Sequence, residues 1–347
     1  MHKEAESKLK KLINDPLKVP DEEVEGFVKA FSSYVRKLEG ARVVVRKDAP
    51  ILGKVGILVG GGSGHEPFWF GFTGRGMYDA VVVGEIFSSP TPDAAYKATK
   101  AINGGKGVLY LLGNYEGDKM NLGISKQMAE AEGIPIEIVN VTDDVASAPK
   151  DRIQDRRGIA GNIFAIKIAG AKAERGGSLG EVKAATLKAN SNIRTMGVAL
   201  SPCIIPSTGG PNFTLAEGEM EVGMGIHGEP GIERTKLKSA NEVAEILTRK
   251  VVEDLPFKAD DRVVVLLNGL GGTPLQELFI LFRKIEEILT CMKIELYKVY
   301  IGNYCTSIDM MGCSMSLMRL DDELKELFDE PADTPYFKMY PVQKVKP

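Results

Sequence analysis

Short aliphatic runs alternate with helix-forming stretches along the chain, and this alternation limits the folds that the chain can adopt. In the first half, the predicted strands are residues 42–46, 55–59, 80–83, 108–112 and 136–141, and the predicted helices are residues 22–37, 92–102, 119–132 and 158–174. Strands that alternate with helices in this way are typical of an α/β domain with a largely parallel sheet.

A second series of the same kind begins after Gly176-Gly177. Ser178, with Glu181 three residues later, forms a capping-box pattern that predicts a helix over 178–190. The strands expected beyond it are residues 196–200, 219–225, 262–267, 293–301 and 314–320, and the long helices are residues 240–253 and 274–290. We therefore predict two α/β domains, residues 1–190 and 191–347, each with a mostly parallel or mixed sheet flanked by helices. We expect stretch 1–11 to fray and stretch 330–347 to wrap around the surface or to be mobile.

The composition argues against several classes of protein. The chain has 347 residues, 44% of them hydrophobic, and its net charge of −3 offers no basic field to nucleic acid. No apolar stretch approaches the roughly 20 residues that span a bilayer. Four cysteines without CxxC spacing, and without a secretory signal before them, are typical of reduced thiols. These features predict a cytoplasmic protein that engages neither nucleic acid nor membranes.

Two of the three histidines lie in glycine-rich loops. His65 ends the run Gly60-Gly-Gly-Ser-Gly-His, directly after a predicted strand, and Glu66-Pro67 follows it. Glycines let a ligand approach the backbone closely, and histidine can act as a nucleophile, acid or base at neutral pH. The loop lacks the third glycine of a dinucleotide fingerprint and the Gly-Lys-Ser/Thr of a P-loop. It therefore favours a small-molecule site over a nucleotide site, with a tight structural turn as the plain alternative.

The other histidine, His227, lies in Gly-Met-Gly-Ile-His-Gly-Glu-Pro-Gly, residues 223–231, and repeats the order His, Glu, Pro. A single histidine in a turn is more often structural than catalytic, and the repetition favours function here. Two histidines without HExxH and without a nearby cysteine do not predict zinc, so we expect no metal site. The glycine-rich residues 268–274 are expected to form a strand-to-helix turn, with anion binding at the helix N-terminus as the alternative.

Two further polar loops follow predicted strands in the first half. Residues 84–93 contain Ser89, and residues 113–118 end in Asp118. Because ligands of open α/β sheets bind at the carboxyl ends of the strands, we expect His65, Ser89 and Asp118 on one rim. A carboxylate that faces a bound hydroxyl can act as a general base. The alternatives are local ones, namely a proline-stiffened helix cap in the first loop and an N-cap role for Asp118.

Taken together, these segments resemble the substrate-binding K subunit of dihydroxyacetone (glycerone) kinase over nearly the whole chain. The matching segments are residues 11–15, 60–67, 84–93, 114–118, 156–158, 213–216, 225–231, 270–277 and 304–310. The resemblance implies a two-domain α/β subunit that forms a homodimer, binds a short ketose and passes it to a separate helical phosphoryl-donor subunit. It also implies that this chain binds no cofactor and that ATP or ADP with Mg²⁺ belongs to the partner subunit.

The resemblance further implies a role for each site residue. His227 is expected to attack the ketone carbonyl and form a covalent hemiaminal, and Asp118 to deprotonate the hydroxyl that attacks phosphorus. His65 is expected to hydrogen-bond the ketose, while Gly62 and Ser89 match backbone and side-chain contacts to its oxygens. A nucleophilic imidazole distinguishes a ketone from glycerol, and the covalent bond orients the terminal hydroxyl for in-line attack.

One position departs from the family pattern. Members that use dihydroxyacetone commonly have lysine before Asn-Tyr, and this chain has Gly113 there, at the substrate end of the site. The missing cation and volume predict a roomier, less cationic pocket, in which a four-carbon ketose such as erythrulose competes with dihydroxyacetone. Another open alternative is a ketose-sensing coregulator without kinase activity, although the presence of Asp118 and His65 favours the enzyme.

Overall fold

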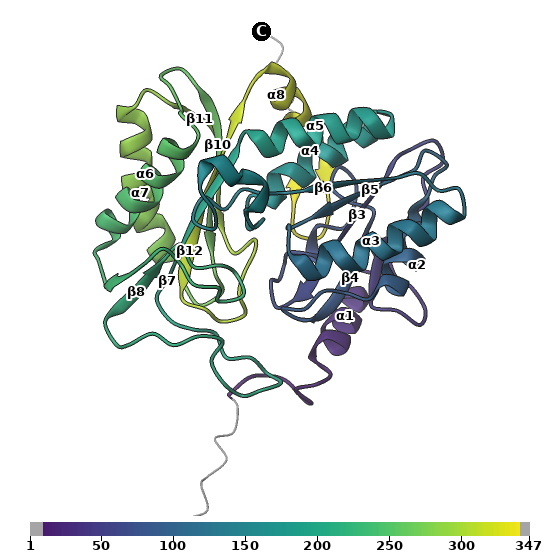
Figure 1. Ribbon diagram of the computed structural model, residues 1–347, viewed down its shortest axis with the longest axis horizontal. Coiled ribbons are helices and arrows are strands. Elements are labelled where there is room, and N and C mark those ends of the chain that lie inside the picture. The colour runs from purple at the N-terminus through teal and green to yellow at the C-terminus, as the bar shows by residue number, and fades with distance from the viewer. Residues whose placement is uncertain (1–9, 341–347) are drawn as a thin grey trace, which may run out of the picture.

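The aliphatic runs of the first half pair into a six-stranded mixed sheet in the computed structural model, which describes residues 10–340 (Figure 1). In spatial order, the strands are β1 (Val35–Lys37), β2 (Val43–Arg46), β4 (Ala80–Ile86), β3 (Gly56–Ser63), β5 (Val108–Leu112) and β6 (Ile136–Asn140). Strands β4, β3, β5 and β6 run parallel, whereas β1 and β2 join antiparallel at one edge. Because β4, β3 and β5 are parallel neighbours, the loops that follow these three strands leave the sheet at the same end.

The second half forms another six-stranded mixed sheet. In spatial order, its strands are β11 (Glu295–Gly302), β10 (Arg262–Gly269), β12 (Gly312–Leu320), β7 (Ile193–Ala199), β8 (Glu219–Val222) and β9 (Glu233–Lys236). Strands β10 and β11 pair in parallel, and the other neighbouring strands pair antiparallel. The predicted fold class, two α/β sheets flanked by helices, is therefore confirmed.

Helices cover the outer faces of both sheets and fill the space between them (Figure 1). The outer helices are α2 (Pro92–Ile102) and α3 (Glu116–Ala131) on the first sheet and α6 (Ala240–Asp254) and α7 (Leu275–Cys291) on the second. Between the sheets lie α4 (Asn162–Glu174), α5 (Leu179–Ser191) and α8 (Asp322–Asp329). Helix α4 is buried around nearly its whole circumference, as expected for a helix without a solvent face.

The central core contains side chains from both halves of the chain. Val59 and Leu111 of the first sheet share one cluster with Phe164 of α4 and with Val264 and Leu266 of the second sheet. The two outer cores, beneath α2 and α3 and beneath α6 and α7, are separate from it. The division into domains at residue 190 therefore remains a prediction.

The helix expected over 22–37 has other bounds. It is α1 (Val19–Ala30), because the chain turns after Phe31 and Val35 pairs with Arg46 in the sheet. As far as residue 340, the stretch after residue 330 runs along the surface, with Tyr336 and Tyr340 exposed, and it is anchored there because Phe337 and Met339 are buried in the central core. Its short strands β13 (Ala332–Asp333) and β14 (Lys338–Met339) pair with each other. Residues 1–9 and 341–347 lie outside the described part of the chain.

The helices of residues 10–340 include none that is both long and apolar enough to cross a membrane.

The close packing of α4 on the first sheet gives a stability prediction. A Cβ atom on Gly170 would lie 2.2 Å from the carbonyl oxygen of Met77 and 2.6 Å from Gly76. Relief of such an overlap typically costs about 1–3 kcal/mol, so Gly170→Ala should lower the free energy of unfolding in denaturant by that amount. Gly123 of α3 has open space around it and is the control. Gly123→Ala should raise the free energy of unfolding by about 0.5–1 kcal/mol, and equal effects of the two changes would contradict the packing described here.

Candidate functional site

Three loops of the first sheet meet beyond the carboxyl ends of β4, β3 and β5. The His65 ring stacks on the Phe87 ring with 5.0 Å between centroids, which joins the loops after β3 and β4. Gly62, at the end of β3, also lies close to the loop after β4, since a Cβ on Gly62 would lie 2.4 Å from the backbone nitrogen of Ser88. Ser89 lies against α3, since a Cβ on Gly117 of this helix would lie 3.2 Å from the Cβ of Ser89. The predicted convergence of these loops is therefore present.

The fourth loop comes from the second sheet and brings His227 to the same place. After β8, the chain turns at Gly223 with φ of 82° and returns along β9. The His227 ring lies 4.9 Å from the His65 ring and 4.7 Å from the Tyr115 ring, measured between centroids. The two histidines that the sequence singled out are thus neighbours, although they lie 162 positions apart in the sequence.

Backbone pairing between the loops fixes His65. The backbone nitrogen of Ile308 donates to Gly64 at 2.8 Å, and that of Thr306 donates to His65 at 3.1 Å. The Thr306 carbonyl in turn accepts a hydrogen bond from Nδ1 of His65 at 2.7 Å. Because a carbonyl can only accept, the proton of the neutral ring is on Nδ1 and the lone pair is on Nε2.

His65 is therefore a hydrogen-bond acceptor rather than an acid. Burial, together with the neighbouring His227, lowers the pKa of His65 to about 3, so the ring is neutral at pH 7. Its Nε2 atom is buried and has no protein partner. A ligand hydroxyl is the kind of group that satisfies such an atom.

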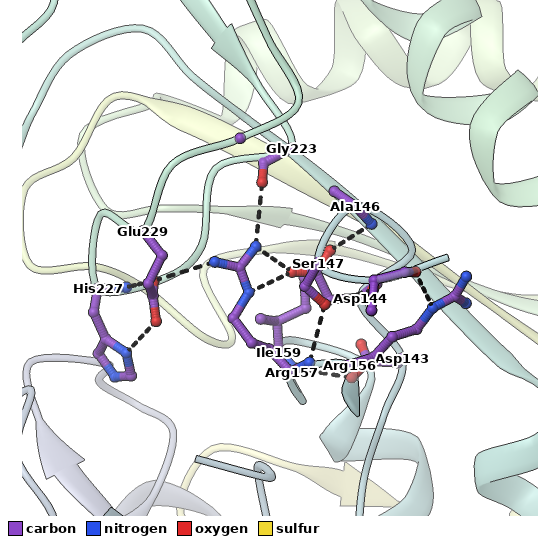
Figure 2. A network of polar contacts seen from close by, with 12 residues as sticks. Asp143, Asp144, Ala146, Ser147, Arg156, Arg157, Ile159, Gly223, His227 and Glu229 are labelled. Atoms are coloured by element: carbon purple, nitrogen blue, oxygen red, sulfur yellow. Dashed lines mark hydrogen bonds and ion pairs between the residues drawn. The ribbon is translucent and has the colours of Figure 1, made fainter. Parts of the chain in front are cut away.

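His227 has the same tautomer for a different reason. Its Nδ1 lies 2.9 Å from Oε1 of Glu229, and its backbone nitrogen donates to Oε2 of the same carboxylate at 2.9 Å (Figure 2). Burial tends to raise the pKa of Glu229, but the hydrogen bond from His227, the charge of that ring when it is protonated and the charge of Arg157 lower it to about 2. The ionised carboxylate holds the proton on Nδ1, so Nε2 carries the lone pair. That nitrogen can act as a nucleophile.

Asp118 is a buried carboxylate within α3, and the N-cap alternative is wrong. The helix begins at Glu116 with Tyr115 as its N-cap, so Asp118 is the third helical residue. Its Oδ1 atom is buried and has no protein partner. Burial raises the pKa of Asp118 to about 6, although Ser89 and His227 act to lower it. A carboxylate with this pKa is largely ionised at pH 7 and is more basic than an ordinary aspartate.

Gly113 lies close to two neighbours. A Cβ on Gly113 would lie 3.1 Å from the Tyr115 ring and 3.2 Å from the carbonyl oxygen of Gly158. A larger residue would fit here only if these neighbours moved slightly, and the roomier pocket expected from this glycine remains a prediction. The glycine allows Tyr115 to pack against the backbone and reach His227.

Sequence reasoning missed several residues that shape the site. Glu229 was visible as part of the second histidine loop, two residues after His227, and received no role. Thr306 and Arg157 lie in the matching segments 304–310 and 156–158 but received no role, because their partners lie far away in the sequence. The loop 268–274 is the predicted strand-to-helix turn, whose Asn268 side chain binds the backbone of Tyr304 and Cys305. Within residues 10–340, no group of three or more His, Cys, Asp or Glu side chains is placed to hold a metal ion.

The fold and site define a two-sheet α/β protein with paired histidines beside a buried carboxylate, and residues 25–336 match the family model described as the Dak1 domain. The chain belongs to this family, and within it to the dihydroxyacetone kinase K subunits, as the resemblance in sequence indicated.

Three similar proteins illustrate the range of the family. The chain is 46% identical over 332 residues to the PTS-dependent dihydroxyacetone kinase 2, dihydroxyacetone-binding subunit DhaK, of Listeria innocua, covering 95% of this chain and 100% of that one. It is 41% identical over 328 residues to the D-erythrulose kinase of Mycolicibacterium smegmatis, covering 94% of this chain and 56% of that protein. A solved structure described as the dihydroxyacetone kinase operon co-activator DhaQ has a TM-score of 0.86 and 31% identity, covering 93% of this chain and 99% of that one.

The burial of Asp118 predicts a pH-dependent stability. The folded pKa of about 6 exceeds the ordinary aspartate value of 3.8, so folding disfavours the ionised form. This penalty is fully present above pH 6, at about 3 kcal/mol or less, and disappears as pH falls toward 4. Asp118→Asn should therefore be more stable than the native protein at pH 8, and the difference in free energy of unfolding should shrink between pH 6 and pH 4.

The control is Asp93, which occupies the first turn of α2 and has a side chain that is 64% exposed. Asp93→Asn should give no stabilisation that grows with pH. A constant difference between Asp118→Asn and the native protein from pH 4 to pH 8 would contradict the raised pKa of Asp118.

Proposed function

We propose that this protein is the ketose-binding subunit of a multisubunit dihydroxyacetone kinase. The main support for this proposal is that the nucleophilic His227 lies beside two buried atoms that lack partners, namely Nε2 of His65 and Oδ1 of Asp118. A short polyhydroxy ketone matches this arrangement, because it offers one carbonyl and flanking hydroxyl groups. The Listeria relative is named as a dihydroxyacetone-binding subunit, which supports the same substrate class.

Capture of the ketose begins with a covalent step. Nε2 of His227 bonds to the carbonyl carbon, the π electrons move to the carbonyl oxygen, and that oxygen takes a proton from solvent to give the hemiaminal hydroxyl. The imidazole becomes cationic, and the ionised Glu229 on Nδ1 stabilises this charge. His65 accepts a hydrogen bond from a ketose hydroxyl, while the backbone around Gly62 and the hydroxyl of Ser89 contact the remaining oxygens.

Phosphoryl transfer follows on the captured substrate. Asp118 takes the proton from the terminal hydroxyl of the ketose, and the hydroxyl oxygen bonds to phosphorus while the bond from phosphorus to the donor breaks, so that the donor leaves with the electron pair of that bond. We infer that the donor is a separate helical subunit, which the name of the Listeria relative as a dihydroxyacetone-binding subunit supports. In a nucleotide-dependent system, ATP or ADP with Mg²⁺ would be bound by that partner rather than by this chain.

We also infer a homodimer and a cytoplasmic location. Leu275, Phe279 and Ile280 of α7 are exposed large hydrophobic side chains, which support a contact with a second copy. All four cysteines are free thiols, as is usual in a reducing compartment.

A second candidate function is ketose sensing without phosphorylation. The structural likeness to the DhaQ co-activator supports it. The buried and unpaired carboxylate of Asp118 argues for the enzyme, because a sensor has no proton to remove and gains nothing from the cost of burying this group.

The covalent step gives the first functional prediction. Incubation with dihydroxyacetone should add the mass of one ketose per chain, and a crystal of the complex should show density continuous with Nε2 of His227. His227→Asn should abolish the adduct, because amide nitrogen is not nucleophilic. Ketose bound at full occupancy but separated from His227 would exclude the hemiaminal.

The role of Asp118 gives the second functional prediction. With a donor subunit present, Asp118→Asn should reduce kcat by about 10² or more while the adduct still forms, because a general base acts mainly in the transition state. In the native protein, kcat should rise with pH through a pKa of about 6, the value for Asp118. An Asp118→Asn variant with normal turnover, or with the same pH profile as the native protein, would remove the residue from the reaction.

The identity of the ketose gives the third functional prediction. Because Gly113 packs against Tyr115, Gly113→Lys should displace that ring and change the shape of the site beside His227. An extra carbon typically alters kcat/KM by about 10- to 200-fold, so the native protein should accept both dihydroxyacetone and erythrulose. Gly113→Lys should change their ratio. A ranking that both Gly113→Lys and Gly113→Ala leave unchanged would show that this position does not set substrate size.

A further inference from the structure

The side chain of Arg157 lies between two carboxylates behind His227 (Figure 2). Its Nε and Nη2 atoms lie 3.0 Å and 2.8 Å from Oδ2 of Asp144. Its Nη1 atom lies 3.9 Å from Oε2 of Glu229, the oxygen that also accepts the backbone N–H of His227. Arg157 therefore joins Asp144 to the carboxylate that sets the tautomer of His227.

The chain holds Arg157 at both its backbone and its side chain. The backbone nitrogen of Arg157 donates to Ser147 at 3.0 Å, and its carbonyl accepts from Asp144 at 3.1 Å. At the guanidinium end, Nη2 also lies 3.4 Å from the carbonyl oxygen of Gly223, where the His227 loop begins. Asp144 itself is fixed by the backbone N–H of Ala146 at 3.0 Å. The position of the guanidinium is therefore set before any ligand arrives.

Gly225 is an independent sign that the loop is shaped around this ion pair. A Cβ on Gly225 would lie 2.1 Å from Oε2 of Glu229 and 2.5 Å from Nη1 of Arg157. Any larger residue would push the carboxylate and the guanidinium apart. The glycine two residues before His227 thus gives space for the Arg157–Glu229 contact.

We propose that Arg157, anchored by Asp144, is a positioning residue that holds the carboxylate of Glu229 in place against Nδ1–H of His227, so that Nε2 of His227 retains the lone pair needed for attack on a carbonyl. The inference rests on the proposed function of His227 and extends it to a residue that touches neither substrate nor imidazole. Without the guanidinium, Glu229 keeps its contact with His227 but loses the fixed positive charge behind it. A carboxylate that turns away from Nδ1 no longer selects the Nδ1–H tautomer.

The test compares Arg157→Gln with the native protein in two measurements. The first is the ¹⁵N NMR spectrum of the His227 ring without ligand, assigned by its loss in His227→Asn. The native ring should give two widely separated nitrogen signals, as a single neutral tautomer does, and the signals should move together in Arg157→Gln. The second is the ketose concentration that half-saturates the dihydroxyacetone adduct, which should rise by about 10- to 100-fold, the usual effect of removing a residue that orients a histidine.

The control is Arg194→Gln, which removes another buried arginine that is ion-paired, in this case with Asp254. It should leave the His227 signals and the half-saturating concentration unchanged. If Arg157→Gln does not fold, Asp144→Asn replaces it, because this variant retains the guanidinium and removes the carboxylate that anchors it. Arg157→Lys should restore part of the adduct affinity by returning the charge.

The outcomes separate this inference from the proposed function. Native tautomer signals in Arg157→Gln would overturn the positioning role, whether or not adduct affinity falls. Equal losses in Arg157→Gln and Arg194→Gln would also overturn it, because the effect would then be general destabilisation. If the native protein forms no ketose adduct while Arg157→Gln still mixes the tautomers, the proposed function fails and the positioning role stands.

Discussion

The site depends on backbone pairing between the loop after β3 and the loop that joins β11 to β12. Ile308 donates to Gly64, Thr306 donates to His65, and Phe68 donates to Tyr304. These bonds connect the two sheets at the point where the histidines meet, and the Thr306 carbonyl also fixes the His65 ring. A displacement of one sheet relative to the other would therefore change the ring geometry and the tautomer of His65 together.

Exclusion of water gives each group in the site its chemical character. The same low-dielectric surroundings lower the pKa of His65 to about 3 and raise that of Asp118 to about 6, because burial penalises the charged form of both. Glu229 is the exception, since His227 and Arg157 outweigh burial and keep it ionised. The result is a neutral acceptor, a moderately strong base and a polarised nucleophile within one small volume.

The sequence predicted those parts of the site that local patterns determine. His65, Ser89 and Asp118 follow three strands, and the order β4, β3, β5 brings their loops together as the α/β pattern indicated. The link from His65 to Thr306 spans 241 positions, and the contact from Arg157 to Glu229 depends on the packing of two sheets. Neither contact has a periodicity or a motif in the sequence that would connect its two residues. The N-cap expected at Asp118 was wrong because the helix begins at Glu116, two residues before Asp118. The N-cap residue there is Tyr115, whose side chain makes no capping hydrogen bond.

The covalent capture proposed above would resolve a difficulty that the small size of a ketose creates. A triose has few atoms, and each can contribute only a limited binding free energy, so hydrogen bonds alone give weak affinity and poor rejection of glycerol. A carbon–nitrogen bond adds affinity that only a carbonyl compound can obtain. That bond requires a neutral imidazole with a defined free nitrogen, and the Glu229 carboxylate on Nδ1 provides this condition. In the proposed mechanism, the orientation of one ring by a carboxylate, and the proposed positioning of that carboxylate by an arginine, serve selectivity as much as rate.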